Sequence, residues 1–345
     1  MDLIVVGAGW AGERHVQAIK ALQEEGADVR LAALVDTDAH HLAAKAAEWG
    51  VEATYHDLPA ALSALPHADA VVLATPHHLH REGTEQAASA GLHVLVEKPM
   101  ALTLEDADAM IQACRDARTT LMVAESARYT RRARTVRDVL DRGTIGQVLT
   151  GRLNLIPRGR KTFAYPGRRA WLADPAVCGG GIWMLNGIHS MSVARMLLGE
   201  VTSIVAREVH SDEFRSELES TVVALLSFDS GAVLTMIVSA ELHGYRRYGD
   251  LVLFGSEGTL DVNWRYGEGV TVYTDGEPEV LPCPSDERGG APGGFVRELE
   301  EFLSAIAEGR EPYTSGRCER ETLAAILAGY ESMRTGQPVA PQPAP

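Results

Sequence analysis

The chain has 345 residues, more than one ordinary hydrophobic core supports, so two domains are expected. Hydrophobic residues make up 46% of the sequence and charged residues 23%, the balance of a soluble globular protein. The formal net charge of -15 argues against a nucleic-acid partner, because phosphate binding needs a basic face.

Membrane proteins and disulfide-rich proteins are also disfavoured. No uninterrupted apolar stretch approaches the roughly 20 residues that span a bilayer, so no membrane partner is expected. The four cysteines lie far apart and form no Cys-x-x-Cys pair, so neither a structural zinc site nor a disulfide framework is indicated. We therefore expect a reducing, cytoplasmic compartment.

The first third of the chain alternates short apolar runs with amphipathic segments. This alternation predicts a parallel sheet with helices on both faces, an α/β arrangement. The runs expected as strands are residues 3–6, 31–35, 70–74, 94–96 and 121–123.

Directly after the first predicted strand the sequence reads Gly-Ala-Gly-Trp-Ala-Gly, a complete G-x-G-x-x-G. In this context Gly7 permits a tight turn, Gly9 lets backbone approach a pyrophosphate, and Gly12 lets helix and strand pack closely. Exposed N–H groups and the dipole of the following helix favour phosphates. The motif therefore predicts a dinucleotide site, which also includes Trp10 and Ala11.

Asp36 ends the second predicted strand, at about the expected 20 residues beyond the glycine motif. A carboxylate there accepts hydrogen bonds from the ribose hydroxyls of NAD and repels the 2′-phosphate of NADP. Because Thr37 and Asp38 follow without a nearby arginine, NAD is the predicted cofactor. The alternative is that Asp36 caps the helix predicted over residues 39–49.

The predicted strand over residues 70–74 leads into a loop with three histidines. A zinc site needs three or four converging ligands, and no Asp or Cys spacing completes one here, so no metal is expected. We expect His77 to line the nicotinamide side of a cleft, because it follows a strand at its carboxyl end. For His80, the alternative is that it only begins the next helix.

The apolar run over residues 94–96 ends abruptly in Glu97-Lys98-Pro99. Ligands of open α/β sheets bind beyond the carboxyl ends of the strands, so Glu97 and Lys98 are expected to project into a cleft. Pro99 fixes the backbone there and restricts Lys98 to extended conformations, and the sequence leaves open whether their bond is cis. The alternative is a solvated strand end.

Several motifs together resemble one known family. The glycine motif with His15, Thr75-Pro76 with His80, and above all Glu97-Lys98-Pro99 are similar to those of the glucose-fructose oxidoreductase, inositol dehydrogenase and MocA (Gfo/Idh/MocA) family. Trp171, Gly179-Gly180-Gly181 with Gly187 and His189, and Tyr330-Glu331-Ser332 extend the resemblance over nearly the whole length. By this resemblance Thr75, Pro76, His80, Glu97 and Lys98 join the cofactor-binding residues.

The resemblance implies an N-terminal Rossmann dinucleotide-binding domain and a C-terminal α+β domain with a large, mostly antiparallel open sheet. Alternating apolar residues favour strands over residues 148–155, 202–209, 221–228, 233–240, 251–254 and 270–273, and helices are expected over residues 127–142 and 295–307. In relatives of this kind the open sheet carries the subunit interface, which implies a homodimer or homotetramer.

The expected division is an NAD-binding Rossmann domain over residues 1–123 and an α+β substrate and oligomerisation domain over residues 124–337. A C-terminal helix over about 318–333 is expected to pack back on the Rossmann domain. Residues 338–345 lack the apolar content for a core and are expected to form a flexible tail.

The resemblance implies that Lys98 and His189 are the polar groups of a hydride transfer with NAD. An imidazole exchanges a proton near neutral pH, and an ammonium stabilises negative charge on the reacting oxygen. The alternative for His189 is a buried structural residue. Polyol dehydrogenases of the family carry an aspartate four residues before this histidine, where this chain has Leu185. Asn186, three residues before His189 on a predicted helix, is a candidate substrate ligand but cannot act as a base.

The segment over residues 157–169 is basic in an otherwise acidic protein. Arg168, Arg169 and Tyr165 are candidates to clamp a substrate carboxylate or phosphate, and the resemblance adds Trp171 to the substrate-binding residues. Pairing with acids of a neighbouring subunit, or a solvated surface, are the alternatives.

These observations favour an NAD-dependent oxidoreductase that transfers hydride between nicotinamide and a secondary alcohol or ketone of a sugar, sugar acid or cyclic polyol. Leu185 keeps other functions open. One is a dehydrogenase of cis or trans dihydrodiols, carboxylated or not; the others are a redox-neutral lyase or hydrolase that uses NAD, and a non-catalytic NAD-binding regulator.

Overall fold

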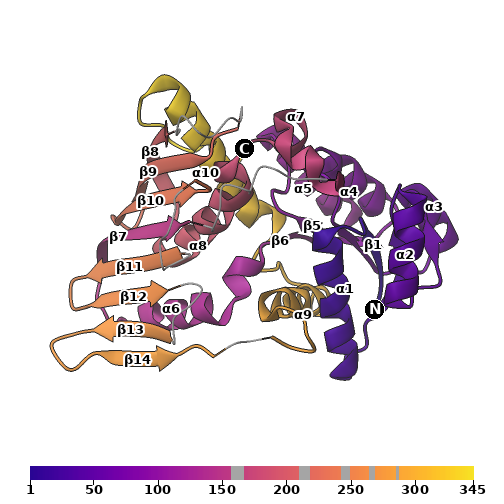
Figure 1. Cartoon of the computed structure of the whole chain (residues 1–345), viewed down its shortest axis with the longest axis horizontal. Coiled ribbons are helices and arrows are strands. Elements are labelled where there is room, and N and C mark those ends of the chain that lie inside the picture. Colours follow the sequence, from indigo (N-terminus) through magenta and orange to yellow (C-terminus); the bar gives the residue numbers. More distant parts are fainter. Residues whose placement is uncertain (157–166, 210–217, 242–248, 264–268, 285–286) are drawn as a thin grey trace. The chain divides into compact units, whose positions relative to one another are not determined.

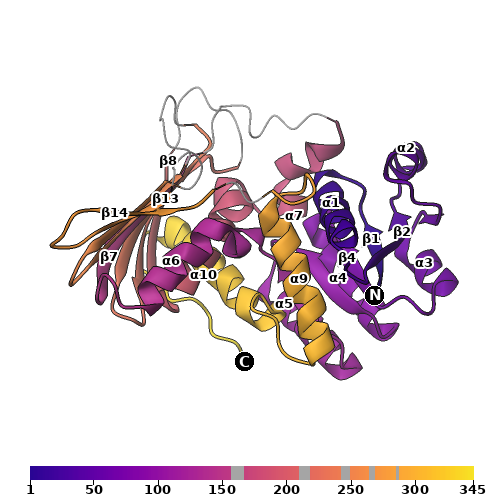
Figure 2. The same cartoon turned by 90° about the horizontal axis from the view of Figure 1, so that it is seen from below.

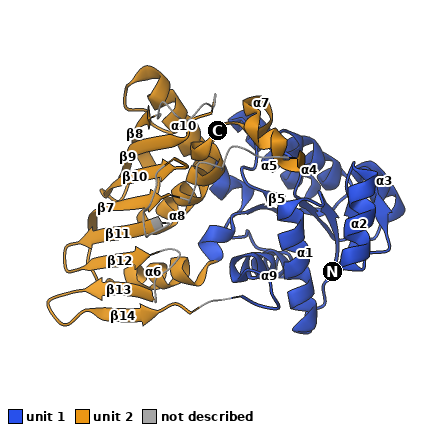
Figure 3. Cartoon of the chain, in the orientation of Figure 1, with its two compact units in different colours: residues 1–129, 286–320 blue, residues 130–285, 321–345 orange. Residues whose placement is uncertain are grey.

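The structure, a computed structural model, describes residues 1–156, 167–209, 218–241, 249–263, 269–284 and 287–345. The chain forms two compact units, drawn in different colours in Figure 3. Unit 1 comprises residues 1–129 and 286–320, and unit 2 comprises residues 130–285 and 321–345.

Unit 1 contains the predicted parallel sheet. Its strands are β1 (Asp2–Val6), β2 (Arg30–Val35), β3 (Thr54–Tyr55), β4 (Ala70–Leu73), β5 (His93–Glu97) and β6 (Leu121–Ala124). They lie in the order β3-β2-β1-β4-β5-β6, and neighbouring strands run parallel. The order changes direction between β1 and β4, and open α/β sheets bind ligands beyond the carboxyl ends of the strands at such a point.

Helices connect these strands, as the alternating pattern predicts. They are α1 (Trp10–Glu24), α2 (Ala39–Trp49), α3 (Leu58–Ala64), η1 (His77–Leu79), α4 (His80–Ser89), α5 (Leu104–Ala117) and η2 (Ser126–Tyr129). Side-chain caps start several of them. The Thr103 hydroxyl, for example, accepts a hydrogen bond from the Asp106 backbone N–H at 3.1 Å, which satisfies a donor that the helix leaves unpaired.

Helix α9 (Gly293–Glu308) belongs to unit 1, whereas the expected domain division left residues 286–320 in the second domain. Figures 1 and 2 show α9 beside α1. Val296, Leu299 and Phe302 join Val16 and Ile19 of α1 in one buried cluster. Contacts of this apolar face with α1 therefore put α9 in unit 1. Helical periodicity alone does not specify which unit a helix packs against.

Unit 2 contains the expected open sheet. Its strands are β7 (Val148–Leu155), β8 (Val201–Val209), β9 (Thr221–Phe228), β10 (Val233–Ser239), β11 (Gly249–Gly255), β12 (Thr259–Asn263), β13 (Gly269–Tyr273) and β14 (Glu279–Pro282). Their order is β14-β13-β12-β11-β7-β10-β9-β8. The β7–β10 pair is parallel and the other neighbouring pairs are antiparallel. β12 and β14 are strands that the sequence pattern did not predict.

Helices cover the inner face of this sheet (Figure 2). They include α6 (Arg131–Asp141), α8 (Ile188–Leu198) and the part of α10 (Gly316–Thr335) that lies in unit 2. The helix predicted over residues 127–142 is divided between η2 and α6, because the Thr130 side chain caps α6 at the Ala133 N–H. α10 begins in unit 1, where Arg320 Nε donates to Asp108 Oδ1 at 3.0 Å.

The other face of the sheet, here called the outer face, leaves apolar side chains in contact with solvent. Large residues of this face that are between 41% and 55% exposed are Val209, Val223, Leu225, Phe254, Tyr273 and Val280. Within the segment expected to be a flexible tail, Val339 forms an antiparallel bridge with Ile204 of β8. None of the described helices combines the length and apolar character that a membrane span requires.

Candidate functional site

The glycine turn of unit 1 has the shape that a dinucleotide phosphate requires. Gly7 has a φ of +99°, and an added Cβ would lie 2.4 Å from the Ala74 carbonyl oxygen, so a side chain does not fit. A Cβ on Gly12 would lie 1.9 Å from the Gly7 carbonyl oxygen. At Gly9, no described atom lies within 4 Å of an added Cβ. The turn is therefore open at its second glycine, beside the N-terminus of α1, where a pyrophosphate would fit.

Trp10 lies next to this opening and is 55% exposed. Its ring meets Phe295 of α9 edge to face, with ring centroids 6.3 Å apart, and the Arg14 guanidinium lies 5.4 Å from the indole centroid. Neighbouring side chains thus hold the indole while leaving much of it open. Trp10 is therefore a candidate for contact with a bound cofactor.

Asp36 is buried at the end of β2 and holds the glycine turn. Its Oδ2 accepts from the Ala8 N–H at 2.9 Å, and its Oδ1 accepts from the Asp38 N–H at 3.0 Å. The cap of α2 is Asp38, whose Oδ1 accepts from the His41 N–H at 3.1 Å. The alternative interpretation of Asp36 as the cap is therefore wrong, because the neighbouring aspartate occupies that position.

The loop after β4 is connected to the loop after β5. His77 is buried in η1, and Thr75 and Pro76 are half-buried. His80 is fully buried, with Nδ1 3.0 Å from the Pro99 carbonyl oxygen and Nε2 3.0 Å from the Thr75 carbonyl oxygen. Burial lowers the pKa of His80, and a neutral ring donates to one of these carbonyls at a time. This placement favours a supporting role for the ring.

The exit of β5 carries the acid and base of the Glu97-Lys98-Pro99 motif. Glu97 is buried, and its Oε1 lies 3.0 Å from His15 Nε2 of α1. Its Oε2 accepts from the Lys98 backbone N–H at 3.2 Å. Lys98 is half-buried, and the Lys98–Pro99 peptide bond is cis. Glu97 therefore connects the first helix after the glycine turn to the backbone of Lys98.

Glu298 of α9 is a second buried acid in this part of unit 1. Its side chain is fully buried, and neither carboxyl oxygen has a hydrogen-bond partner among the described residues. Burial raises its pKa well above the ordinary value, and the charges of Glu97 and Glu125 raise it further. These surroundings therefore favour the protonated, uncharged form of the Glu298 carboxyl.

In unit 2, the residues around His189 form an unusual helix start. A π-helical turn, η4 (Trp183–Gly187), runs directly into α8. Asn186 lies in this turn, so the α-helical spacing that put it on the same face as His189 does not apply there. Asn186 and His189 are half-buried, and Leu185 is 6% exposed. Such π turns occur frequently at functional sites.

The glycine triplet before this turn lies against a buried carboxylate. A Cβ on Gly181 would lie 2.2 Å from the Glu219 carbonyl oxygen, and one on Gly180 would lie 1.9 Å from Tyr330 Oη. Glu219 Oε2 accepts from the Gly181 N–H at 2.9 Å, and Oε1 accepts from Tyr330 Oη at 2.7 Å. Close approach of these groups is thus the reason that glycine is required.

Residues 1–125 match the oxidoreductase family with an NAD-binding Rossmann fold, and residues 133–261 match the GFO/IDH/MocA C-terminal domain. The chain belongs to the Gfo/Idh/MocA family. It is therefore an NAD-binding oxidoreductase, and the predicted fold class, with its Rossmann sheet and mostly antiparallel open sheet, is confirmed.

Two relatives and one solved structure are similar to this chain over most of their length. D-apiose dehydrogenase of Paraburkholderia graminis is 30% identical, covering 97% of this chain and 88% of that protein. Myo-inositol 2-dehydrogenase of Thermotoga maritima is 26% identical, covering 97% and 96%. An oxidoreductase of Agrobacterium radiobacter, solved in complex with NAD+, L-tartaric acid and magnesium, is 26% identical with a TM-score of 0.86, covering 99% and 98%.

The basic segment expected to bind the substrate of this Gfo/Idh/MocA protein is described in part. Tyr165 lies outside the described residues. Arg168, Arg169 and Trp171 lie in the short helix η3 (Gly167–Ala173), which precedes α7 (Pro175–Cys178). Both arginines are exposed and Trp171 is half-buried. Their side chains are thus available to solvent in unit 2.

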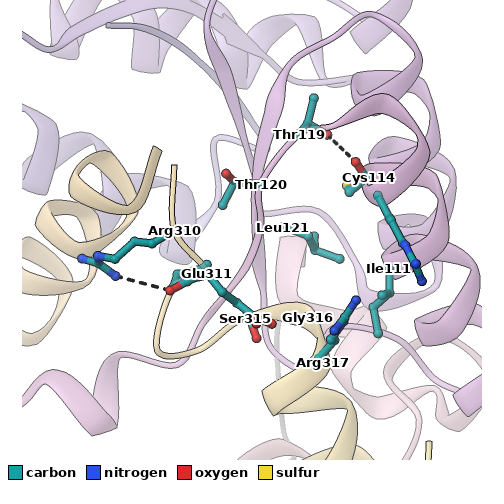
Figure 4. A pocket seen from close by; sticks show the side chains of 12 residues that line it. Ile111, Cys114, Thr119, Thr120, Leu121, Arg310, Glu311, Ser315, Gly316 and Arg317 are labelled. Carbon is teal, nitrogen blue, oxygen red and sulfur yellow. Dashed lines mark hydrogen bonds between the residues drawn. The ribbon is translucent and has the colours of Figure 1, made fainter. Parts of the chain in front are cut away.

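A pocket of about 270 Å3 lies elsewhere in unit 1 (Figure 4). Thr119, Thr120 and Leu121 line it at the amino end of β6, together with Gly316 and Arg317 at the start of α10. Ligands of open α/β sheets bind at the carboxyl ends of the strands. This pocket therefore does not coincide with the residues that the Gfo/Idh/MocA motifs indicate.

Sequence reasoning missed Glu219 and Glu298, and it named Tyr330 without giving it a role. Neither acid belongs to a recognisable motif, and each acquires its surroundings from segments far away in the chain. Three consecutive glycines before a helix were the one available signal, because such a run indicates that another group approaches the backbone closely. The sequence does not indicate which group that is.

Proposed function

We propose that this protein transfers hydride between NAD and a secondary alcohol or ketone of a sugar, sugar acid or cyclic polyol. The observation that carries the proposal is Lys98 at the carboxyl end of β5, in the same sheet as a glycine turn that is open at Gly9. Membership of the Gfo/Idh/MocA family supports it, as do the names of the relatives, which act on D-apiose and myo-inositol.

In the proposed reaction, NAD accepts or returns the hydride when it is bound. The ammonium of Lys98 hydrogen-bonds the reacting oxygen and stabilises negative charge that develops on it. The Glu97 carboxylate, held by His15 at 3.0 Å, fixes the backbone from which Lys98 projects. The predicted cofactor-binding residues Thr75, Pro76 and His77 follow β4, the strand next to β5.

His189 is proposed to exchange the hydroxyl proton, because an imidazole ring nitrogen can accept a proton and return it. Asn186 offers both a donor and acceptors to a second substrate hydroxyl. The Leu185 side chain carries no charge and no hydrogen-bonding group, so the proposed proton transfer does not use an acid at that position. His189 therefore carries this role without the aspartate that the family resemblance implies.

Asp36 is proposed to make NAD the preferred cofactor. Its carboxylate already lies against the Ala8 N–H in the glycine turn, at 2.9 Å. Ribose hydroxyls would add donors to this carboxylate, whereas a 2′-phosphate would bring a second negative charge beside it. Discrimination against NADPH follows from that repulsion.

A carboxylated substrate is the proposed target of Arg168 and Arg169. Their guanidinium groups are exposed, and paired arginines suit a carboxylate. The related oxidoreductase crystallised with L-tartaric acid, a hydroxylated dicarboxylate, supports this choice. Replacing both arginines by alanine is expected to raise KM for a sugar acid much more than KM for NAD.

The outer face of the open sheet is proposed to form a subunit interface with a second copy of the chain. Its apolar side chains include Leu225, which is 45% exposed, and Phe254, which is 43% exposed. An apolar sheet face of this kind is stable in water when a partner covers it. A homodimer buries the same residues of both copies.

The test of the function is turnover. The purified protein and NAD are incubated with one candidate substrate at a time: D-apiose, myo-inositol, an aldonic acid or a cis-dihydrodiol. The absorbance of NADH is followed in each reaction. We expect turnover with a sugar, an aldonic acid or a polyol. Turnover of the dihydrodiol alone would replace the proposed substrate class, and NADH binding without turnover of any alcohol would contradict the proposal.

Lys98→Ala supplies the residue-level control for this assay. Loss of a group that acts on the reacting oxygen is expected to lower kcat by about 10²- to 10⁴-fold, with little change in the Kd of NADH. The matched substitution is Lys45→Ala, which removes another half-buried lysine of unit 1, one that pairs with Glu48 at 2.9 Å and with Glu13 at 3.3 Å. Equal kcat losses in the two variants would contradict the role of Lys98.

A further inference from the structure

A buried acid lies at the start of the helix that carries His189. Glu219, next to the N-terminus of β9, is 6% exposed, and its carboxylate accepts three hydrogen bonds. Two come from the backbone N–H groups of Gly181, at 2.9 Å, and Trp183, at 3.1 Å. The third comes from Tyr330 Oη of α10, at 2.7 Å.

The same residue also satisfies the N–H group between those two. The Ile182 N–H donates to the Glu219 main-chain carbonyl at 2.9 Å. A helix leaves its first N–H groups without partners inside the helix, and a cap supplies them. Here the cap comes from another segment of the chain, and its carboxyl oxygens lie at the positive end of the helix. One residue therefore sets both the position and the direction of the helix start.

Tyr330 and the glycines leave this arrangement little room to shift. A Cβ on Gly180 would lie 1.9 Å from Tyr330 Oη, and the Trp183 indole N–H donates to the Ile326 carbonyl of α10 at 3.0 Å. The π turn begins at Trp183, so both ends of that residue are held where the helix starts. Asn186 and His189 follow on the same continuous run of helix.

From this arrangement we infer that Glu219, supported by Tyr330, is the positioning residue for His189 and Asn186 in the reaction. The inference rests on the proposed function only for the consequence in catalysis. The structural claim is that the carboxylate sets the orientation of the helix start and, through it, of the His189 ring. Loss of one acceptor oxygen of Glu219 would then reorient the π-helical turn and displace the Asn186 and His189 side chains together.

Two conservative variants test this claim. Glu219→Gln preserves the size of the side chain but replaces one acceptor oxygen by a donor, and Tyr330→Phe removes only the third hydrogen bond. Misplacement of a reacting group by about 1 Å lowers rates by roughly a hundredfold. We expect kcat/KM for the sugar or polyol to fall 10- to 100-fold in Glu219→Gln and less in Tyr330→Phe, with the Kd of NADH unchanged.

Ser332→Ala is the matched control for lost stability. Ser332 is fully buried on the same helix as Tyr330, and its Oγ accepts from the Ala206 N–H at 3.0 Å and donates to the Gln337 carbonyl at 2.7 Å. Its loss is expected to lower Tm as much as Tyr330→Phe does, without lowering kcat/KM. A loss of kcat/KM that follows Tm across all three variants would overturn a positioning role.

A second readout is independent of turnover. In 15N-histidine-labelled protein, the His189 ring signal is assigned by its disappearance in His189→Asn, and amide hydrogen exchange is followed over residues 179–187. We expect Glu219→Gln to move the His189 ring signal and to accelerate exchange in that segment, whereas Ser332→Ala does neither. An unmoved ring signal would refute the positioning claim. A moved signal in a protein that oxidises no alcohol would instead refute the proposed function.

Discussion

At the scale of single residues, the carboxyl groups of Asp36 and Asp38 have different structural roles. Asp36 holds Ala8 in the glycine turn, whereas Asp38 caps α2. Their side chains have the same chemistry and lie two positions apart, so they form a natural pair for comparison.

Asp36→Ala is expected to reduce the preference for NADH over NADPH at least about tenfold, because one repelled charge near the 2′-phosphate is worth more than 1.4 kcal/mol at short range. The ratio of Kd values is measured by titration of each nucleotide, with the fluorescence of the protein's tryptophans as the signal. Asp38→Ala should lower stability by about 1 kcal/mol through loss of the cap and leave the ratio unchanged. An unchanged ratio in Asp36→Ala would exclude Asp36 as the selecting residue.

Glu298 predicts a pH dependence of stability. Its pKa is raised above the ordinary 4.5 in the folded protein, so the folded state retains a proton that the unfolded chain releases. Stability therefore falls as pH rises from 4.5 toward the raised value. Glu298→Gln cannot ionise, so its free energy of unfolding relative to the wild type is expected to increase with pH.

Urea unfolding at about pH 5 and about pH 8 measures this difference, which amounts to about 1.4 kcal/mol for each titrated unit of the shift. Glu301→Gln is the control on the same helix. Glu301 accepts from Arg310 at 2.6 and 2.9 Å, so its substitution removes an ion pair and should destabilise the protein. If the difference in unfolding free energy between Glu298→Gln and the wild type were the same at both pH values, the pKa of Glu298 would not be raised in the folded protein.

At the scale of elements, the glycines of the turn before α1 are required for different physical reasons. Gly12→Ala would place a Cβ 1.9 Å from the Gly7 carbonyl oxygen, so α1 must move away from β1. Gly9→Ala meets no described atom within 4 Å, and its φ of −76° suits alanine. The two substitutions therefore separate folding from cofactor binding.

We expect Gly9→Ala to retain the wild-type Tm while weakening NADH binding at least about tenfold, because its Cβ enters the space for the pyrophosphate. Gly12→Ala should lower both Tm and affinity. Thermal unfolding and NADH titration on the same samples measure these effects. Wild-type affinity in Gly9→Ala would mean that the pyrophosphate does not bind over the second glycine.

At the scale of the whole molecule, the proposed subunit interface on the outer face of the open sheet predicts a homodimer. Stable interfaces bury about 1,200 to 2,000 Å2, an area that a broad sheet face supplies. Leu225→Glu places a charge on this face in β9, next to the edge strand β8, and we expect it to shift the protein to a monomer in light scattering after gel filtration. Leu149→Glu is the control, because Leu149 is 52% exposed but has the strand parity of the inner face. A monomeric wild type would contradict the proposed interface.

Local sequence by itself determined the parallel sheet, the glycine turn and the family. Strand and helix periods are local properties, and the turn needs residues such as Gly7 and Gly12 at fixed short spacings. Helix α9 was recognised as a helix by the same logic. Its place in unit 1 was not, because an apolar helix face fits more than one neighbour until the rest of the chain excludes the others.

Only the tertiary structure decided which carboxyl groups cap helices and which are buried. Asp38 rather than Asp36 caps α2, Glu298 is buried without a partner among the described residues, and Glu219 caps a helix that begins more than thirty positions earlier. The physical reason is the same in each case. Burial and hydrogen bonding set the state of a carboxyl group, and both arise from segments that meet only when the chain has folded.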